Sequence, residues 1–334
     1  MKTICLEKHG GPEVLKLTER PVPVPREGEI LVRMAYAGIS RPDKLMRSGE
    51  YPWTKEILPF YPGLYGAGTV EKLGPGVTEF SVGQRVYVEH PIACACYAEY
   101  KCAPLRFVTP IPEGTDMALA SIAASSLIVW GMLTECFPHA EGKTLYIQGA
   151  AGSIGTAVTQ IAPLLGMRVI SSASTEAKCS YLRSIGGTDV FCYRTENVKD
   201  RILSLTNGRG ADIIMDQSVG EGFASQMEYL ADMGTILIYN NTKGFPSKNV
   251  IASMTERFGN CPGIRAFSFH YFDDKPELLA QKKQEMFSLL QQGKIQPHIG
   301  ARFALAEAVK AHELLDSGDF FGSIVLNCRS DETK

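Results

Sequence analysis

Thr144-Leu-Tyr-Ile-Gln148 runs directly into Gly149-Ala-Ala-Gly152-Ser-Ile-Gly155 near the middle of this chain. The first five residues are mostly apolar and β-prone, and the spaced glycines open an amphipathic pattern, so the stretch predicts a strand, a turn and a helix. Missing Cβ atoms let the backbone turn tightly and approach a pyrophosphate, whose charge is met by free N–H groups and by the positive end of the helix dipole. We therefore expect a dinucleotide at this turn, with Gly149, Ala151 and Gly155 among its contacts.

The residues after the turn strengthen this interpretation, because spaced glycines alone also occur in flexible loops. The apolar residues of one helical face are Ile154, Val158, Ile161 and Leu165. Gly166 follows as a helix stop, and residues 168–172 supply a second strand. Strand, glycine turn, helix and strand are the parts of a dinucleotide-binding unit.

The end of the second strand indicates which nicotinamide cofactor fits. NAD-binding units place an acidic side chain there, where it binds the ribose hydroxyls and repels a 2′-phosphate. This chain has Ala173-Ser174 instead, and Glu176 is interpreted as a first-turn helix residue that the dipole favours. Ser174, Lys178 and Tyr193 are placed to meet a phosphate, so we expect NADPH. The alternative is that Lys178 is an ordinary solvated surface charge.

Size and composition limit the classes of protein that this chain fits. With 334 residues it exceeds what one hydrophobic core usually supports, so two domains are the default. A net charge of -2 offers no broad basic field for nucleic acid or an anionic membrane. The N-terminus shows no targeting signal, and the apolar segment 118–133 is short and rich in serine, which predicts a buried helix rather than a membrane span.

The cysteines indicate a cytoplasmic protein without a metal site. All nine are scattered through the chain, and an odd, scattered set is typical of reduced thiols. Cys94, Cys96 and Cys102 lack the paired C-x-x-C spacing of zinc sites, and Tyr97 to Tyr100 has the pattern of a strand. We expect no metal there.

The arrangement of turn signals predicts two kinds of structure along the chain. The first third has short β-rich runs such as Ile30 to Met34 and Arg85 to Val88, which predict a small irregular β domain. From about Gly142, six strands alternate with helices, at 145–148, 169–172, 189–192, 213–216, 234–239 and 264–270. Helices at 276–292 and 306–315 and a strand at 322–326 follow. This pattern predicts an α/β fold with a doubly wound parallel sheet.

These motifs resemble the medium-chain dehydrogenase/reductase superfamily and, within it, the zinc-free, zeta-crystallin-like quinone oxidoreductase branch. The resemblance covers nearly the whole chain. It rests on the order and spacing of His9-Gly-Gly-Pro-Glu-Val14, Gly38-Ile-Ser-Arg-Pro-Asp43, Arg47-Ser-Gly-Glu-Tyr51-Pro, Pro62-Gly63 with Gly66-Ala-Gly68, Gly83-Gln-Arg-Val86, the glycine turn and Asp216-Gln-Ser-Val-Gly220.

The resemblance implies a GroES-like β domain formed from both chain ends, residues 1–122 and 272–334, and a Rossmann NADPH-binding domain at 123–271. It implies an active site in the cleft between them. By position, the implied cofactor contacts are Gly152, Ser153, Ile154, Ser174, Lys178, Tyr193, Tyr239, Asn241 and Thr242.

The resemblance also implies that no catalytic zinc binds. Zinc-dependent members hold the metal through a Cys, a His-Glu pair and a distal Cys, and this chain has Ser40, Leu64-Tyr65 and Ala124-Ser125 at those places. A Ser and a Leu cannot replace a thiolate and an imidazole as zinc ligands. Without a Lewis acid, acceptors that delocalise charge, such as quinones and activated alkenes, become the expected substrates.

Five residues are candidate catalytic or pocket groups under this resemblance: Ser40, Asp43, Tyr51, Trp53 and Tyr65. Tyr51 would donate a hydrogen bond or a proton to the developing enolate, and Trp53 would form an apolar wall. The alternatives are that the aromatic residues only pack the proline-containing loops and that Asp43 caps a turn.

The leading hypothesis is an NADPH-dependent reductase of quinones or other conjugated carbonyl compounds. One alternative is an enal or enoyl-thioester reductase, and another is a non-catalytic NADPH-binding sensor or structural protein. The apolar segment 265–271 is expected at a sheet edge, where an uncovered strand invites pairing, so we expect a homodimer.

Overall fold

The computed structural model describes residues 1–51, 54–89 and 95–329 of the chain, which forms two compact units. One unit comprises Met1–Ala124 and Lys283–Lys334, and the inserted unit comprises Ser125–Lys282. Both ends of the chain therefore contribute to the same unit. The limits 1–122, 123–271 and 272–334 remain a prediction about which segments fold as independent domains.

The inserted unit contains a parallel sheet whose strand order identifies the fold. Its strands are β8 (Thr144–Gln148), β9 (Arg168–Ala173), β10 (Asp189–Cys192), β11 (Ala211–Asp216), β12 (Leu230–Ile238) and β13 (Gly263–Ala266). Within the described residues, their order across the sheet is β10-β9-β8-β11-β12-β13, and neighbouring strands are parallel. This is the doubly wound order, in which the first and fourth strands lie side by side at a topological switch point. The predicted Rossmann sheet is confirmed.

The last predicted strand of this sheet is too long. β13 ends at Ala266 rather than at His270, because the chain turns into a 3-10 helix at Phe269–Phe272. Ser268 begins that helix, and its hydroxyl oxygen accepts a hydrogen bond from the His270 amide at 3.3 Å. Serine side chains compete with strand pairing in this way. β13 does lie at the sheet edge, as expected.

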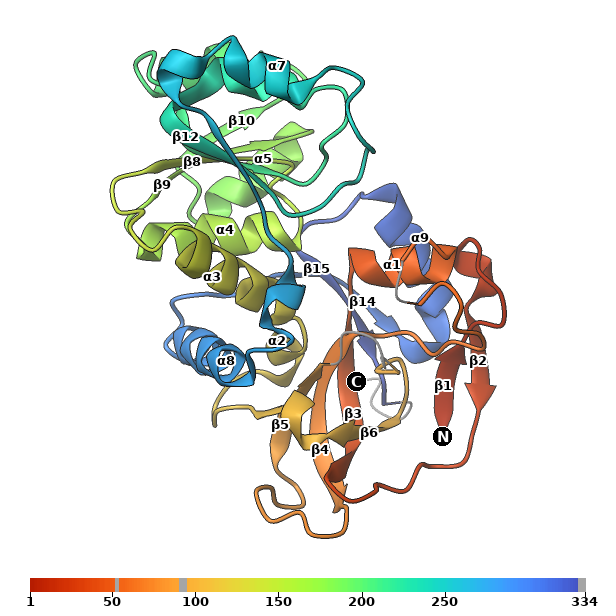
Figure 1. Ribbon diagram of the computed structural model, residues 1–334. Helices are drawn as coiled ribbons and strands as arrows, with labels where there is room; N and C mark the ends of the chain where they lie inside the picture. The colour runs from red at the N-terminus through yellow and green to blue at the C-terminus, as the bar shows by residue number, and fades with distance from the viewer. Residues whose placement is uncertain (52–53, 90–94, 330–334) are drawn as a thin grey trace. The chain divides into compact units, whose positions relative to one another are not determined.

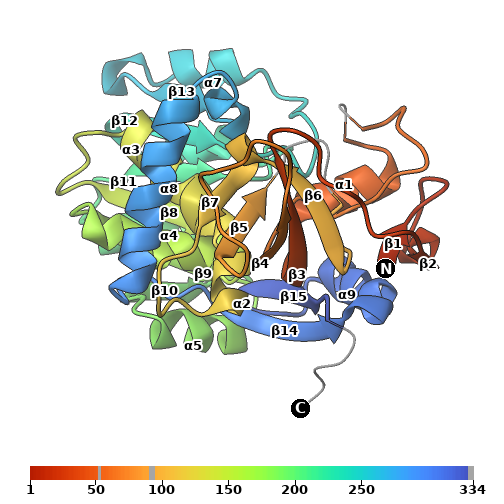
Figure 2. The ribbon, with the colours of Figure 1, turned by 90° about the horizontal axis from the view of Figure 1, so that it is seen from below.

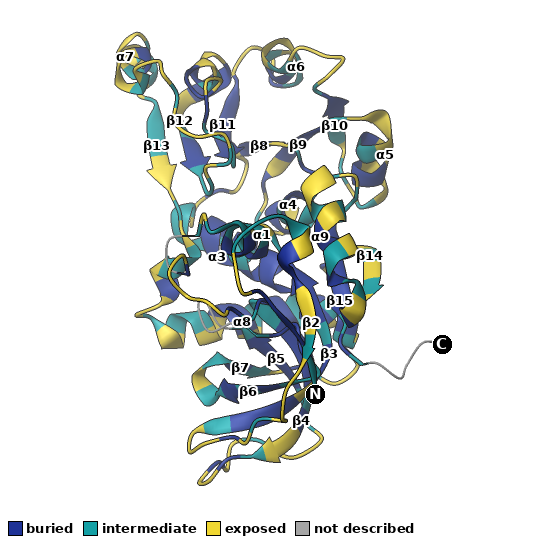
Figure 3. Ribbon diagram, turned by 90° about the vertical axis from the view of Figure 1, so that its right-hand side faces the viewer, coloured by how far each residue is buried: buried dark blue, intermediate teal, exposed yellow. Residues whose placement is uncertain are grey.

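Helices cover both faces of the parallel sheet, and its central strands are therefore buried on both sides. They are α3 (Ala124–Cys136), α4 (Ser153–Leu164), α5 (Glu176–Ser184), α6 (Val198–Leu205) and α7 (Val250–Thr255). Figure 1 shows α3 and α4 on one side of the strands and α7 on the other. Figure 3 shows buried residues in the strands and exposed residues on α6 and α7.

The apolar segment predicted as one buried helix at 118–133 forms two helices. α2 (Met117–Ser121) ends at Ile122, whose ψ of 11° leaves the helical range, and α3 begins two residues later. Asp116 caps α2 by accepting a hydrogen bond from the Leu119 amide at 2.9 Å. Along the described part of the chain, no helix is both long and apolar enough to cross a membrane.

The first unit is built on a mixed sheet from both ends of the chain. Its strands are β3 (Glu29–Ile39), β4 (Tyr65–Leu73), β5 (Arg85–Glu89), β6 (Tyr100–Pro104), β7 (Val108–Pro110), β14 (Ile299–Ala304) and β15 (Ser323–Asn327). In the described ranges the order is β14-β15-β3-β4-β5-β7, and β6 also pairs with β3. β15 runs antiparallel to β3, so the C-terminal segment completes the N-terminal sheet (Figure 2).

Besides α2, the helices that cover the parallel sheet and short 3-10 helices, three α-helices and a pair of strands lie outside the two sheets described above. They are α1 (Arg41–Ser48), α8 (Pro276–Gln291), α9 (Ala308–Ser317) and the antiparallel pair β1 (Lys2–Cys5) and β2 (Lys16–Glu19), and this count covers the described residues. The predicted C-terminal helices and last strand are confirmed, with their ends shifted by one or two residues. The sequence did not predict β14, whose residues alternate between half-buried and exposed.

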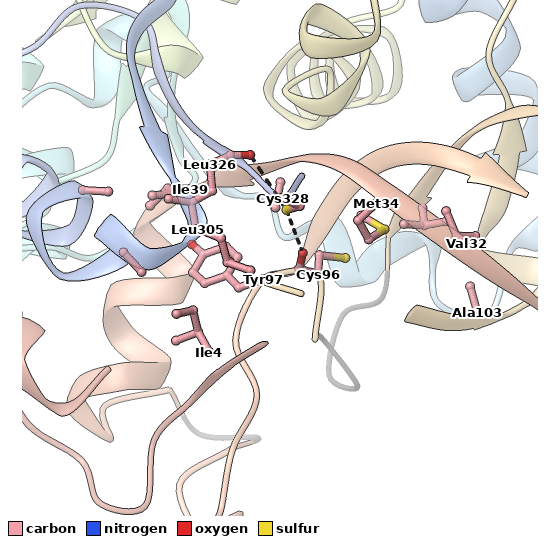
Figure 4. Packing of buried hydrophobic residues seen from close by; sticks show 14 of the residues in the cluster. Ile4, Val32, Met34, Ile39, Cys96, Tyr97, Ala103, Leu305, Leu326 and Cys328 are labelled. Carbon is pink, nitrogen blue, oxygen red and sulfur yellow. Dashed lines mark hydrogen bonds between the residues drawn. The ribbon is translucent and has the colours of Figure 1, made fainter. Parts of the chain in front are cut away.

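The core of the first unit packs residues from distant parts of the chain. Figure 4 shows Ile4, Tyr97, Leu305 and Leu326 within one buried cluster. The strand expected at Tyr97 to Tyr100 is wrong except at its last residue, because Tyr97 turns into this core and Ala98 forms only an isolated bridge.

Candidate functional site

The glycine turn lies where β8 ends and α4 begins, at the switch point of the parallel sheet. Gly149 has a φ of +70°, a left-handed conformation that other residues rarely adopt. The Ala150 amide donates to the Ser172 carbonyl oxygen at 3.0 Å, which ties the turn to β9. Gly152 precedes the first helical residue, Ser153, and carries no side chain that could cap the helix. The first-turn amides and the positive end of the dipole therefore remain available for an anion.

Close packing requires the third glycine of the turn. A Cβ at Gly155 would lie 2.2 Å from the Ala150 carbonyl oxygen and 2.3 Å from Ala150 Cα. A larger residue would push the first turn of α4 away from the glycine turn that precedes it. A Cβ at Gly152, by contrast, would meet no atom within 4 Å. The turn is thus a backbone cradle, open at Gly152, of the kind that binds phosphate.

The candidate 2′-phosphate residues gather where β9 and β10 end. Tyr193 follows β10, and its amide donates to the Ala173 carbonyl oxygen at 3.0 Å, so Tyr193 lies beside the segment that continues into Ser174. Lys178 lies in the first turn of α5, where its amide donates to Thr175 Oγ1 at 3.3 Å. Ser174, Lys178 and Tyr193 are all half-buried. The structure brings these three predicted residues to one corner of the sheet.

Glu176 has the place that the sequence predicts, in the first turn of α5. Its carboxylate pairs with the Arg183 guanidinium at 2.5 Å, and both side chains are largely exposed. The Glu176 carboxylate is therefore engaged by Arg183 at the surface. β9 itself ends at Ala173, and Ser174 follows it.

The segment after β12 is hydrogen-bonded to Gln217, and the Gln217 side chain lies beside the glycine turn. The Tyr239 amide donates to the Asp216 carbonyl oxygen and the Thr242 amide donates to the Gln217 carbonyl oxygen, both at 3.1 Å. Gln217 Nε2 lies 3.1 Å from the position that a Cβ at Gly149 would occupy. The three predicted contacts on this segment, Tyr239, Asn241 and Thr242, therefore lie on a stretch of backbone that runs beside the end of β11.

Ser40 and Asp43 form a hydrogen-bonded pair at the start of α1. Ser40 is the N-cap, with extended backbone, and its amide and hydroxyl both donate to Asp43 Oδ2, at 2.9 and 2.5 Å. Asp43 Oδ1 accepts a hydrogen bond from the Gly63 amide at 3.2 Å. The capping role considered for Asp43 is therefore present in the fold.

Burial dominates the ionisation of Asp43. Its side chain has no solvent exposure, and desolvation raises its pKa to about 6. Hydrogen bonds from Ser40, Gly63 and Leu64 act in the opposite direction but do not offset the burial. A buried carboxyl whose pKa is shifted in this way is found at functional sites more often than elsewhere.

Tyr65 is the first residue of β4, which pairs with β3, the strand that ends one residue before Ser40. The pKa of Tyr65 is raised by burial and by the charge of Asp43. The ring lies directly on Gly38 of β3, since a Cβ there would lie 2.2 Å from Tyr65 Cε2. Ser40, Asp43 and Tyr65 are thus brought together by a helix cap and by one glycine in the neighbouring strand.

Tyr51 follows α1 and is half-buried against the core of the first unit. The loop that contains it is braced by His9, whose Nδ1 lies 3.1 Å from the Met46 carbonyl oxygen and whose Nε2 lies 2.9 Å from the Lys55 carbonyl oxygen. The packing role considered for Tyr51 is therefore present, and its role as a donor remains a prediction.

In the described part of the chain, no group of three or more His, Cys, Asp or Glu side chains is placed to hold a metal ion. Two residues raised by the sequence, Trp53 and Cys94, lie outside the described residues.

Sequence reasoning missed Gly38 and Gln217 as parts of the site. Both belong to motifs on which the family resemblance rests, and the sequence around each of them contains a feature that could have identified it. Gly38 interrupts an apolar strand, which indicates a close approach by another group, and Gln217 follows a buried strand, as Gly149 does.

Two family models match the chain, one in each unit. The model of the Alcohol dehydrogenase GroES-like domain matches residues 26–113, and the model named Zinc-binding dehydrogenase matches residues 153–265. The predicted combination of a GroES-like domain with a Rossmann sheet is confirmed.

Relatives of known name match over almost their whole length. Quinone oxidoreductase from Pseudomonas aeruginosa is 31% identical over 327 residues, which cover 97% of this chain and 99% of that protein. A 2-haloacrylate reductase from a Burkholderia species is 27% identical over 328 residues, which cover 96% and 97%. The solved structure of Escherichia coli quinone oxidoreductase complexed with NADPH matches with a TM-score of 0.90 at 26% identity, over 98% of this chain and all of that one. The chain belongs to the zeta-crystallin-like quinone oxidoreductase branch of the medium-chain dehydrogenase/reductase superfamily.

Proposed function

We propose that this chain is an NADPH-dependent oxidoreductase that reduces quinones or other conjugated carbonyl compounds by hydride transfer without zinc. The observation that carries the proposal is the contact between Gly155 and Ala150 at the switch point, because it holds a helix N-terminus against an open glycine turn. The relatives named quinone oxidoreductase support the reaction class.

The residues of the inserted unit fit NADPH. The open position at Gly152 and the first-turn amides of α4 would take the pyrophosphate. Ser174, Lys178 and Tyr193 would take the 2′-phosphate at a strand end that carries no acid. When bound, NADPH supplies a hydride from its nicotinamide ring. The related Escherichia coli protein, crystallised with NADPH, supports this assignment.

Metal-free catalysis follows from the donor set of the first unit. At the places where zinc-dependent members carry a thiolate and an imidazole, this chain carries Ser40 and Leu64. The Ser40 hydroxyl already donates to Asp43, and Leu64 has no donor atom in its side chain. Such a set does not form a zinc site, so hydroxyl groups must stabilise the charge that develops on the substrate oxygen.

The hydroxyl of Tyr65 is suited to that task. Tyr65 keeps partial exposure, and its ring is fixed against Gly38 before any substrate binds. Preorganised donors of this kind stabilise an oxyanion more than mobile water does. Tyr51 and Trp53 remain candidates for further contacts with the substrate.

Reduction of an activated alkene is the second candidate function. The specific observation in its favour is the Burkholderia 2-haloacrylate reductase, which matches this chain over nearly its full length. An enal or an enoyl thioester has the same conjugated carbonyl and places negative charge on the same oxygen after hydride addition.

A homodimer in the cytoplasm is the proposed setting of the enzyme. β13 lies at the edge of the parallel sheet, where Arg265 and Ala266 are exposed, and a second copy of this strand would cover that edge. Light scattering tests the assembly, and a monomer at micromolar concentration would rule it out. Neither nucleic acid nor a membrane is expected as a partner, given the net charge of -2.

Anaerobic stopped-flow measurements test the function. NADPH is mixed with the chain and with para-benzoquinone, methyl vinyl ketone, crotonaldehyde or chloroacrylate, and the loss of nicotinamide absorbance is followed. We expect turnover with at least one acceptor, and faster reduction of the enal or acrylate than of the quinone would select the alkene reductase. Tight NADPH binding with no turnover on any acceptor would favour a non-catalytic sensor instead.

A further inference from the structure

We propose that Asp216 is a positioning residue for NADPH, which sets the Gln217 side chain beside the glycine turn by holding Val219 in a left-handed conformation. The proposal deepens the proposed function and rests on its assignment of the cofactor. It assigns Gln217 as a further contact of the bound cofactor and Asp216 as a group that acts through it.

Val219 has a backbone conformation that its side chain disfavours. It lies in the turn after β11 with a φ of +54°, and Gly220 follows with a φ of +62°. Glycine adopts such left-handed values freely, whereas a positive φ is a genuine outlier for a β-branched residue. Conformations of this kind persist only where surrounding contacts enforce them, and they cluster at ligand-binding sites. The turn after β11 therefore needs contacts that hold Val219 in place.

The Asp216 carboxylate supplies these contacts. Asp216 is the last residue of β11 and is buried. Its Oδ1 accepts hydrogen bonds from the Ser218 amide at 2.6 Å and from the Val219 amide at 3.0 Å. Its Oδ2 accepts a hydrogen bond from the Gln226 side chain. An aspartate side chain that binds the backbone two residues further on stabilises a turn in this way.

The turn is also joined to the segment that follows β12. The Gln217 carbonyl oxygen accepts a hydrogen bond from the Thr242 amide at 3.1 Å. The Gly220 amide donates to the Gly244 carbonyl oxygen at 2.8 Å. These two bonds lie on either side of Val219, so a change in its conformation would disturb both. It would move Gln217 together with the segment that contains the predicted contact Thr242.

The Gln217 side chain meets the glycine turn at Gly149. Gln217 Nε2 lies 3.1 Å from the position that a Cβ at Gly149 would occupy, and Gln217 is half-buried. A side-chain amide has two N–H donors, which suit the oxygen atoms of a pyrophosphate. The turn held by Asp216 thus brings an amide donor to the place where the cofactor phosphates are expected.

The charge of Asp216 alone would act against an anionic cofactor, so its hydrogen bonds and its charge predict opposite effects of substitution. Loss of the hydrogen bonds should weaken NADPH binding, whereas loss of the negative charge should strengthen it. Asparagine separates the two effects, because its side-chain oxygen accepts hydrogen bonds from both amides without carrying a charge.

Fluorescence titration of NADPH into variants of the full chain tests the proposal. Asp216→Ala should lower the affinity roughly 10–100-fold, and Asp216→Asn should stay within about threefold of the wild type. Val219→Gly added to Asp216→Ala should restore most of the affinity, because glycine adopts a φ of +54° without help. A general loss of structure would not be repaired by this second change.

Titration with NADH locates the effect. The two cofactors share the pyrophosphate and differ in the 2′-phosphate, so Asp216→Ala should weaken the binding of both by the same factor. A loss confined to NADPH would place the effect at the 2′-phosphate residues Ser174, Lys178 and Tyr193 and would contradict a contact near Gly149.

Asp212→Ala is the matched control. Asp212 lies near the other end of β11, is similarly buried, and accepts hydrogen bonds from the Thr144 amide at 2.7 Å and from Arg209 at 2.8 Å. Its loss should lower the free energy of unfolding, measured with denaturant, and leave the affinity for NADPH unchanged. An equal loss of affinity in Asp212→Ala and Asp216→Ala would show that Asp216 only stabilises the sheet.

Gln217→Ala tests the cofactor contact itself. It should lower the affinity roughly 3–10-fold in the wild type and less in Asp216→Ala, where the side chain is already displaced. If Asp216→Ala fails to fold, Gln217→Ala and the double variant with Val219→Gly decide the outcome. Unchanged affinity in Gln217→Ala, tighter binding in Asp216→Asn, or no recovery on adding Val219→Gly would overturn the proposal. A wild-type chain that binds NADPH but reduces no acceptor would contradict the proposed function alone, and the affinities would still decide the role of Asp216.

Discussion

Arg47 Nη1 lies 3.1 Å from His312 Nδ1, although 265 residues separate them along the chain. Arginine only donates hydrogen bonds, so Nδ1 is the acceptor and the imidazole is neutral, with its proton on Nε2 facing the Tyr97 hydroxyl at 3.3 Å. Arg47 also donates to Asp316 at 2.7 Å. This buried group fastens α1, which contains Asp43 and is capped by Ser40, to α9 at the other end of the sequence.

Acid should weaken the first unit through His312. Burial and then Arg47 lower the pKa of this side chain from 6.5 to about 3, so the unfolded chain binds a proton that the folded chain refuses within that window. The stability is complete above about pH 6.5 and is lost as the pH falls toward 3. Asp43 acts in the opposite sense, since its raised pKa favours the folded state below about pH 6.

Denaturant unfolding of His312→Gln isolates the histidine contribution. The variant should be less stable than the wild type at about pH 7, and the difference should shrink at about pH 5 because glutamine has no proton to gain. A stability difference that is the same at both pH values would show that His312 does not titrate on unfolding.

Gly38→Ala should displace Tyr65, because the new methyl group would lie 2.2 Å from the ring. We expect a loss of about 1–3 kcal/mol in the free energy of unfolding and a lower rate of reduction with unchanged NADPH affinity. Tyr65→Ala removes the obstructing ring, so the double variant should be more stable than the sum of the single changes predicts. Strict additivity would contradict the contact.

Gly155→Ala should weaken cofactor binding by moving α4 away from the turn. A Cβ at this position meets backbone atoms of Ala150, which cannot rotate away as a flexible side chain can. We expect NADPH affinity to fall by roughly tenfold or more, about 1.4 kcal/mol or more, in a fluorescence titration. Gly222→Ala, where a Cβ meets no atom within 4 Å, is the matched control in the same unit and should bind NADPH as the wild type does.

Ser174→Asp should reverse part of the preference for NADPH over NADH. The new carboxylate would stand at the end of β9, where it repels a 2′-phosphate and accepts hydrogen bonds from ribose hydroxyls. We expect the ratio of the two affinities to change by roughly 10–100-fold toward NADH. Glu176→Gln provides the control, since Glu176 is engaged with Arg183 and should leave the ratio unaltered. An unchanged ratio in Ser174→Asp would place the 2′-phosphate elsewhere.

The parallel sheet and its glycine turn could be predicted because their signals are local. Each strand of that sheet is a short apolar run next to a turn signal, and the cap between Ser40 and Asp43 joins residues three positions apart. The sequence did not predict β14, because its residues are only half-buried or exposed and form no apolar run. The end of β13 was misplaced because a serine cap outweighed the apolar residues that follow it.

The assembled site depended on contacts that no local pattern contains. The Tyr65 ring lies over Gly38 because β3 and β4 pair as neighbouring strands. The network of Arg47 and His312 likewise forms only after both chain ends have joined one sheet. The burial that raises the pKa of Asp43 is a property of the folded core rather than of its sequence neighbours.

An anaerobic single-turnover reaction with NADPH deuterated at the transferred position tests hydride transfer by this chain most directly. With a conjugated carbonyl acceptor present, we expect nicotinamide absorbance to decay in one phase and deuterium to slow this phase, because hydride transfer is the chemical step. Bound NADPH that stays reduced in the presence of every quinone, enone and enal tested would contradict it.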